Sequence, residues 1–318
     1  MRRPILALAG GVGGARLASG LAQVLPADEL VIVVNVGDDF DHLGLRISPD
    51  LDTVTYTLAG VVDPEKGWGR AAESWNFMAE LETVGGETWF RLGDKDLAVH
   101  IERTRRLQAG ESLSEVTAHL CARFGVKAQV IPVSDSLLRT RVETDAGDLA
   151  FQDYFVRKQC GPAVRNVRFD GADGALPSPA LRRLLEAGGP RGVIVCPSNP
   201  WLSIAPILAV PSVRDLLASG RVPVVGVSPI VGGAAVKGPA AKIMAELGIP
   251  VSTLGVAEHY GRLVHAWLID HADAGLQNQI ASQGFSVAVD DTLMTTTAKA
   301  REVACSVLHL LQSLEANQ

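Results

Sequence analysis

The fold is decided near the start of the chain, by residues 5–34, ILALAGGVGGARLASGLAQVLPADELVIVV. Residues 5–9 are a short apolar run that ends in glycines, and residues 15–25 repeat their leucines and valine with helical spacing. Residues 30–34 are a continuous apolar run, typical of a strand buried on both faces. The order strand, glycine loop, helix, strand predicts the first unit of a parallel α/β sheet.

Later segments repeat this alternation. Apolar patterns predict strands over residues 192–196, 222–227 and 285–289, and helices over 212–218, 240–247 and 295–311. Residues 70–122 are mostly helical in pattern, whereas residues 138–144 and 149–155 alternate around a turn and indicate a hairpin. We predict one α/β domain over residues 1–318, Rossmann-like and doubly wound, with a mainly parallel sheet. A helical and hairpin insertion is expected over about 60–190.

Composition excludes several classes of protein. The 318 residues carry a formal net charge of −6, which argues against a nucleic-acid binder, since these normally have a basic excess. The N-terminus lacks the apolar segment of a signal peptide, and no run of 18 apolar residues occurs, so we expect a cytoplasmic protein without a membrane partner. The four cysteines are scattered and show no metal or disulfide spacing.

Glycines 10, 11, 13 and 14 form the first loop that could carry chemistry, because ligands of parallel sheets bind at the carboxyl ends of strands. The loop lacks the Lys-Ser/Thr ending of a P-loop, and Arg16 stands where a dinucleotide fingerprint has its third glycine. Its amides can still line a phosphate at the start of the next helix. A tight structural turn would also explain the glycines.

Two acidic loops follow the second strand. Asp38 and Asp39 are adjacent carboxylates, which suit Mg²⁺ better than the ribose hydroxyl of a dinucleotide, although solvated loop charges remain an alternative. Asp50 and Asp52 flank a predicted helix start. One of them could be an N-cap, so at least one is available for a metal or a substrate.

Three further loops combine charge with hydroxyl and amide groups. Asp94 and Lys95 precede a helix, where Lys95 could neutralise a phosphate or form a surface ion pair. The turns at residues 197–200 and 228–239 suit recognition of a phosphate or a base. The histidines show no metal spacing and are expected to be structural. Acids and amide-rich turns without an evident nucleophile indicate phosphoryl chemistry around Mg²⁺.

Taken in order, these loops resemble one family, the 2-phospho-L-lactate transferases, which are the CofD/FbiA-type enzymes of coenzyme F-420 biosynthesis. The matching motifs are GGVGGAR at 10–16, NVGDD at 35–39, SPDLDT at 48–53, LGDKDLA at 92–98, PSNP at 197–200 and SPIVGG at 228–233. The resemblance implies that a hydroxyl of the deazaflavin Fo attacks a guanosine diphospho-linked three-carbon acid and releases GMP. It also implies Mg²⁺ and a homodimer.

The resemblance assigns roles to individual residues. It implies catalysis and Fo binding by Asp50 and Asp52, with Lys95 as a further Fo contact, although many relatives carry arginine at that position. The implied metal ligands are Asp38, Asp39, Asp50 and Asp94. The implied nucleotide and phosphate contacts are Gly10, Gly11, Gly13, Gly14, Ser198, Asn199, Ser228, Gly232 and Gly233. The donor acid stays open between lactyl, enolpyruvyl and glyceryl forms; GVGGAR at 11–16 and VDPEKGWG at 62–69 resemble bacterial members, which implies an enolpyruvyl rather than a lactyl donor.

Two other functions fit parts of the sequence. An NAD(P)-dependent oxidoreductase would explain the strand, glycine loop and helix but not the aspartate loops. A regulatory protein of the same fold would bind a nucleotide sugar without turnover. The SPDLDT and LGDKD segments favour the transferase over both.

Overall fold

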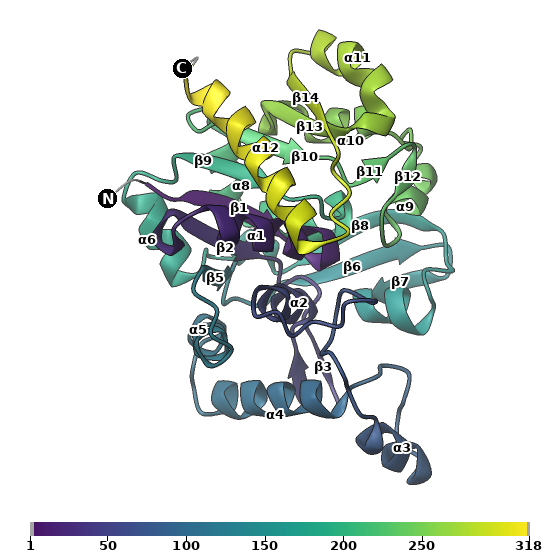
Figure 1. Cartoon of the computed structure of the whole chain (residues 1–318). Coiled ribbons are helices and arrows are strands. Elements are labelled where there is room, and N and C mark those ends of the chain that lie inside the picture. Colours follow the sequence, from purple (N-terminus) through teal and green to yellow (C-terminus); the bar gives the residue numbers. More distant parts are fainter. Residues whose placement is uncertain (1–2, 317–318) are drawn as a thin grey trace.

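Seven parallel strands form the central sheet of the computed structural model, which describes residues 3–316 (Figure 1). The strands are β1 (Ile5–Ala9), β2 (Leu30–Val34), β5 (Gln129–Pro132), β9 (Gly192–Val195), β10 (Val224–Val227), β13 (Ala266–Asp270) and β14 (Ser286–Asp290). Their order in the sheet is β14-β13-β10-β9-β1-β2-β5. The chain therefore winds outward from β1 through β2 and β5, and then returns to add the other four strands on the opposite side of β1.

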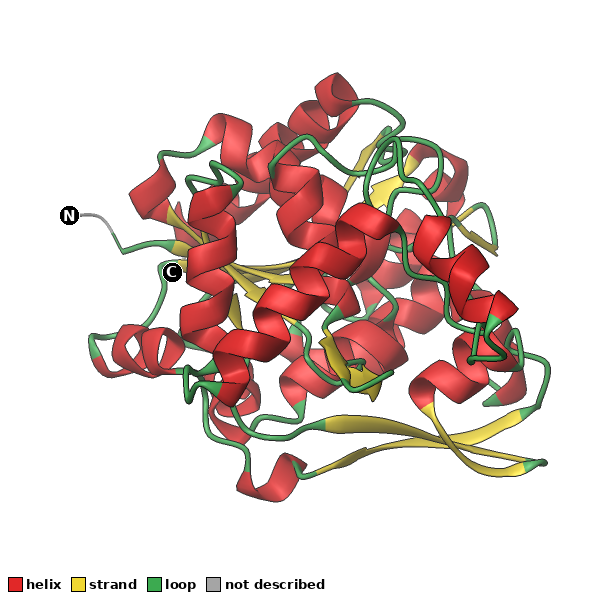
Figure 2. Ribbon diagram, turned by 90° about the horizontal axis from the view of Figure 1, so that it is seen from below, coloured by secondary structure: helices red, strands yellow, loops and turns green. Residues whose placement is uncertain are grey.

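This reversal confirms the predicted doubly wound fold and places its topological switch point between β1 and β9. All five residues of β1 and of β2 are buried, as expected for strands covered on both faces. Helices surround the sheet in Figure 2, and helix α1 packs against α2 and the long C-terminal helix α12. The apolar faces of these elements form the main core.

The described chain has twelve α-helices. They are α1 (Gly11–Val24), α2 (Pro49–Leu58), α3 (Asn76–Thr83), α4 (Asp94–Gln108), α5 (Leu113–Arg123), α6 (Pro179–Glu186), α7 (Ala205–Leu208), α8 (Pro211–Ala218), α9 (Ala240–Glu246), α10 (Thr253–Tyr260), α11 (Gln277–Ser282) and α12 (Thr297–Ala316). The predicted helices over 212–218, 240–247 and 295–311 correspond to α8, α9 and α12.

The predicted insertion over about 60–190 is not one continuous segment. Strand β5 lies within it and forms the edge of the central sheet beside β2, and α6 contributes Leu181 to the main core. Two excursions remain. Helices α3 and α4 lie on the side of α2 away from the sheet in Figure 1, while α5 packs against β5, and residues 139–170 form a separate antiparallel sheet. The termini of the predicted domain, residues 1–2 and 317–318, lie outside the described range.

The predicted hairpin is present in part. Strands β6 (Arg139–Thr144) and β7 (Gly147–Ala150) pair as expected, and β8 (Val164–Asp170) adds a third strand on the other side of β6. Residues 151–157, however, are helical and not extended, with a π-helical turn over Asp153–Arg157. Two short hairpins complete the strands, β3 (Phe40–His42) with β4 (Leu45–Ile47) and β11 (Ile230–Val231) with β12 (Ala234–Ala235).

Within residues 3–316 no single helix has the length and apolar character needed to cross a membrane. One pair, Pro200–Leu208 with Pro211–Ala218, meets the criterion jointly by length and composition, but it is bent by 94°.

Candidate active site

A cavity of about 590 Å³ lies where the switch point predicts a ligand. Its walls come from the start of α1, the first turns of α2 and α4, the loop after β9 and the segment after β10. Further lining residues come from segments 66–69, 89–91 and 151–159. Segments that are distant in the sequence therefore meet around one space.

The glycine segment is helical, and not a loop that precedes a helix. Helix α1 begins at Gly11, so Gly13 and Gly14 lie in its first turn. A Cβ atom on Gly13 would lie 2.2 Å from the carbonyl oxygen of Pro197, and one on Gly14 would lie 2.4 Å from Oγ of Ser198. These glycines let the helix start approach the loop after β9. Gly10, Gly11 and Gly13 line the cavity, whereas Gly14 serves this contact.

Asp50 connects the start of α1 to the end of β2. Its Oδ1 accepts the N–H of Gly11 at 2.8 Å, and its Oδ2 accepts Nδ2 of Asn35 at 2.9 Å. Neither Asp50 nor Asp52 is the N-cap of α2; that position belongs to Ser48, and both aspartates lie inside the first turns of the helix. The predicted capping role is therefore absent, and both side chains face the cavity.

Asp38 lies beside Asp50 and also lines the cavity. Burial raises the pKa of Asp38 well above its usual value, and the charge of Asp50 raises it further. Burial likewise raises the pKa of Asp50, against the hydrogen bonds from Asn35 and Gly11. Two buried carboxylates that repel each other favour a cation between them.

Asp39 lies behind this pair and does not line the cavity. Its Oδ2 accepts a hydrogen bond from the hydroxyl of Ser48 at 2.7 Å, and its Oδ1 is buried without a hydrogen-bond partner in the described part of the chain. Burial raises the pKa of Asp39 to about 7. The structure therefore separates Asp39 from Asp38, although they are neighbours in the sequence.

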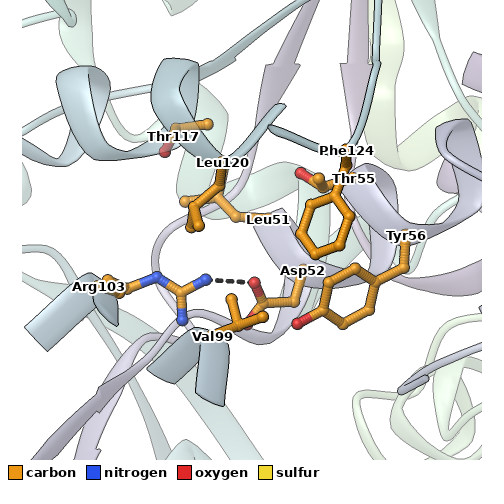
Figure 3. Close-up of a pocket in the computed structure, with 9 residues that line it drawn as sticks. All are labelled: Leu51, Asp52, Thr55, Tyr56, Val99, Arg103, Thr117, Leu120 and Phe124. Atoms are coloured by element: carbon orange, nitrogen blue, oxygen red, sulfur yellow. Dashed lines mark hydrogen bonds and ion pairs between the residues drawn. The ribbon is translucent and has the colours of Figure 1, made fainter. Parts of the chain in front are cut away.

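Asp52 belongs to a buried network with α4 (Figure 3). Its Oδ1 forms an ion pair with Arg103, which also donates to Nδ1 of His100 at 3.1 Å. Nε2 of His100 lies 3.5 Å from Oδ2 of Asp96, whose Oδ1 accepts the hydroxyl of Tyr56 at 2.6 Å. Burial raises the pKa of Asp52, while the guanidinium of Arg103 lowers it. Oδ2 of Asp52 is buried and has no hydrogen-bond partner among residues 3–316.

Asp94 and Lys95 do not line the cavity, so the structure does not bring them together with the other residues predicted for the site. The carboxylate of Asp94 accepts the backbone N–H groups of Asn76 and Phe77 and the hydroxyl of Ser74, so it caps the N-terminus of α3. These hydrogen bonds lower the pKa of Asp94 to about 2. The ammonium of Lys95 donates to two carbonyl oxygens, those of residues 71 and 72. Both side chains are committed to holding the segment before α3.

The hydroxyl- and amide-bearing turns divide in the same way. Ser198, Asn199 and Ser228 line the cavity, and Nδ2 of Asn199 is buried without a hydrogen-bond partner. Gly232 and Gly233 do not line it. Their φ angles of 57° and 77° make the two-residue turn between β11 and β12, which is the reason for glycine at both positions.

Comparison with known proteins identifies the chain. A family model described as 2-phospho-L-lactate transferase CofD matches residues 5–309. The chain belongs to this CofD family. This CofD chain is 42% identical to the phosphoenolpyruvate transferase of Streptomyces griseus, over 98% of its own length and 99% of the relative. It is 38% identical to the 2-phospho-L-lactate transferase of Methanosarcina mazei, over 94% and 98%. As a member of the CofD family, it is a transferase.

A solved structure of a UPF0052-family protein from Bacillus halodurans shares the CofD chain's fold. The TM-score is 0.59 over 97% of this chain and 99% of that one, with 14% sequence identity. This likeness concerns the fold alone.

Several cavity residues of the CofD chain were not predicted from the sequence. They include the aromatic side chains of Tyr56, Trp68, Trp89, Phe90, Phe151 and Phe155, the basic side chains of Arg16, Lys66 and Arg91, and the pair Asp96 and His100. One signal was available for the last pair: Asp96, His100 and Arg103 lie at positions i, i+4 and i+7 of a predicted helix and so share a face. The aromatic residues come from four segments without a common pattern.

Proposed function

We propose that this CofD-family chain transfers a phospho-three-carbon-acid group from a guanosine diphospho-linked donor to the ribityl hydroxyl of the deazaflavin Fo. The single observation that carries the proposal is the composition of the cavity. One space combines a helix N-terminus, two mutually repelling buried carboxylates, and a third carboxylate with an unpartnered oxygen. Phosphoryl transfer needs three functions: a site that binds the anionic phosphates, groups that neutralise their charge, and a carboxylate that accepts a hydrogen bond from the attacking hydroxyl.

The donor side of the cavity is the start of α1. The first N–H groups of a helix have no intrahelical acceptor and favour an anion. Asp50 already accepts the N–H of Gly11, so we assign the diphosphate to the N–H groups of Val12 and Gly13. The side chains of Arg16, Lys66 and Lys237 line the same cavity and supply positive charge for the phosphates.

The acceptor side contains Asp52. The Fo hydroxyl oxygen would attack the phosphorus next to the three-carbon acid, while the bond from that phosphorus to the GMP oxygen breaks. The hydroxyl proton would pass to Oδ2 of Asp52, and the bonding electrons would leave with GMP as phosphate oxygen. Because GMP is already a stable anion on departure, little acid assistance to the leaving group is needed. The aromatic side chains of Trp89, Phe90 and Phe151 provide apolar wall for a planar ring system.

The carboxylates of Asp38 and Asp50 fit a divalent cation that prefers oxygen ligands. Neither carboxylate has a basic partner among residues 3–316 that would offset their repulsion. We propose that these two residues, and not Asp39 or Asp94, hold Mg²⁺. Bound there, Mg²⁺ would neutralise charge on the diphosphate.

The names of the relatives favour an enolpyruvyl donor. Four Streptomyces and Kitasatospora relatives named phosphoenolpyruvate transferase are each 42% identical to this chain, whereas two Methanosarcina relatives named 2-phospho-L-lactate transferase are 38% identical. Acids that differ by a few atoms are separated by only about 1–3 kcal/mol in many pockets. We therefore expect a preference for the enolpyruvyl donor and a slower reaction with the lactyl donor.

Mass spectrometry of the reaction product tests this function. Purified protein would be incubated with Fo, Mg²⁺ and either the enolpyruvyl or the lactyl guanosine diphospho-donor. We expect a phosphodiester of Fo and one equivalent of GMP, both absent when Fo is left out. Donor binding without Fo-dependent GMP release would instead support the regulatory alternative. Saturable NADPH binding would support the oxidoreductase.

A further inference from the structure

The network behind Asp52 contains two side chains, Arg103 and His100, to which the reaction described above assigns no role. Arg103 lies on α4 and is among the largest fully buried side chains, with 2% of its surface exposed. It forms the ion pair with Oδ1 of Asp52 and donates to His100. Burial of a guanidinium is costly unless it is paired, so this position calls for an explanation.

A metal site does not explain the cluster. Asp52, Asp96 and His100 offer ligand atoms that lie within 4.8 Å of one another. The guanidinium of Arg103 already neutralises Asp52 and occupies Nδ1 of His100, and a cation placed among them would be repelled by it.

The donors and acceptors of the network leave one atom free. Arginine only donates, so Nδ1 of His100 is an acceptor and the ring proton lies on Nε2, directed at Asp96. Asp96 also accepts a hydrogen bond from the hydroxyl of Tyr56. His100 therefore has no proton to offer to Oδ2 of Asp52, although its Nδ1 lies only 3.7 Å from that oxygen. Within residues 3–316 no group is hydrogen-bonded to the buried Oδ2, and Asp52 lines the cavity, so a ligand bound there can supply the missing donor.

A small cavity of about 10 Å³ lies against the ion pair (Figure 3). Besides Asp52 and Arg103 it is lined by apolar side chains and by three polar ones, Thr55, Tyr56 and Thr117. Within residues 3–316 the carboxylate of Asp52 is hydrogen-bonded to Arg103 and to none of these three, so the guanidinium is the polar group that fixes its orientation.

We propose that Arg103 and His100 are positioning residues for the acceptor: Arg103 fixes Oδ1 of Asp52, and His100 fixes Arg103, so that Oδ2 faces the hydroxyl of the acceptor substrate. The proposal rests on the proposed function, because it specifies how that site orients the carboxylate of Asp52 towards the hydroxyl of the acceptor substrate. It assigns neither residue a contact with substrate. Their removal should thus affect turnover far more than binding.

Steady-state kinetics of Arg103→Met and Arg103→Lys, with Fo and the enolpyruvyl donor, test the proposal. We expect kcat of Arg103→Met to fall about 10²- to 10³-fold, the loss typical of one preorganised polar contact in an active site. The KM for Fo and the Kd for GDP should change less than about threefold, because the variant keeps the contacts that bind both molecules in the ground state. Arg103→Lys should recover part of kcat because it restores the charge without the planar fork.

His100 provides a second and milder pair of variants. Asn places its carbonyl oxygen near Nδ1, where it can accept from Arg103, whereas Gln reaches towards Nε2. We expect His100→Asn to retain most of kcat and His100→Gln to lose it. Arg105→Met is the matched control, because Arg105 lies on the same helix but is exposed and paired only with Glu102.

A double-variant cycle gives the decisive outcome. If Arg103 acts through Asp52, the double variant Arg103→Met/Asp52→Asn should be no slower than Asp52→Asn alone. Three outcomes would each overturn the positioning role. The losses of kcat from the two single variants could multiply in the double variant, or a folded Arg103→Met enzyme could keep the wild-type kcat. KM and Kd could also rise by as much as kcat falls. If Arg103→Met does not fold, the two His100 variants decide in the same way. Absence of turnover by the wild-type protein would instead reject the proposed function, and this inference with it.

Discussion

The backbone N–H of Gly11 donates a 2.8 Å hydrogen bond to Oδ1 of Asp50. This contact joins the first turn of α1 to the first turn of α2, 39 residues later. The helix N-terminus therefore already faces one protein carboxylate. Two anions at one helix start repel each other. Under the proposed function a diphosphate bound there would therefore need a cation near Asp50, and this contact would tie anion binding to the metal.

Replacement of Asp50 with Asn tests that coupling. One of its two hydrogen-bond donors, Gly11 N–H or Asn35 Nδ2, loses its acceptor, and the negative charge beside Asp38 disappears. We expect kcat to fall at least about 10²-fold at saturating Mg²⁺, the scale of loss for one electrostatic group in an active site. The rise in Tm on addition of Mg²⁺ should also vanish in differential scanning fluorimetry.

Asp41→Asn is the control for that experiment, because Asp41 is 63% exposed and pairs with Arg46 at the surface. Its turnover and its Mg²⁺-dependent Tm should match those of the wild type. If Asp50→Asn and Asp52→Asn both retained full turnover, the assignment of the hydroxyl and metal sites would be wrong.

Gly13→Ala should destabilise the protein although Gly13 lies in a helix. Alanine in place of a helical glycine normally stabilises by about 0.4–1 kcal/mol. Here the new Cβ would lie 2.2 Å from the carbonyl oxygen of Pro197, and backbone must move. We expect a net loss of about 1–3 kcal/mol in urea denaturation, the usual cost of overpacking. Gly174→Ala, with no atom within 4 Å of the new Cβ, should be neutral or stabilising.

The stability of the protein should fall as the pH rises from about 4 to 7 through the contribution of Asp39. Burial raises the folded-state pKa of Asp39 to about 7, from 3.8, so the folded state binds the proton that the unfolded state releases in this window. Each unit of pKa difference corresponds to about 1.4 kcal/mol. Asp39→Asn should therefore gain stability relative to the wild type between pH 4 and 7, by a few kcal/mol in total.

Denaturation with urea at pH 4.5, 6 and 8 measures this difference. The advantage of Asp39→Asn should be smallest at pH 4.5 and constant above pH 7. An advantage that is independent of pH would show that Asp39 is ionised throughout and would refute the assigned pKa direction.

Asp94→Ala separates a structural from a metal-binding role. Because Asp94 caps α3, its loss should lower the Tm by a few degrees, as for other helix caps. The concentration of Mg²⁺ that gives half-maximal activity should remain unchanged, because Asp94 does not line the cavity. A markedly higher Mg²⁺ requirement with an unchanged Tm would restore the metal role that the sequence suggested.

Local sequence patterns determined the frame of this protein. The apolar runs of β1 and β2 and the periodicity of α1 predicted a parallel, doubly wound sheet, because burial on both faces of a strand is legible in a few consecutive residues. The same patterns placed Asp38, Asp50 and Ser198 at strand ends, and all three line the cavity. Strands β5 and β13 were not predicted from the sequence.

Tertiary structure alone decided which of the polar residues in the sequence motifs share the cavity. Asp38 and Asp39 are neighbours, yet one faces the cavity and the other lies behind it; Asp94 resembles a metal ligand, yet it caps a helix. The partnership of Asp52 with Arg103 joins α2 to α4 across 51 residues and has no counterpart in either local motif. A periodic pattern reports the face that a residue turns to the core, whereas its partners depend on how distant elements pack, and that packing gives Asp52 its free oxygen.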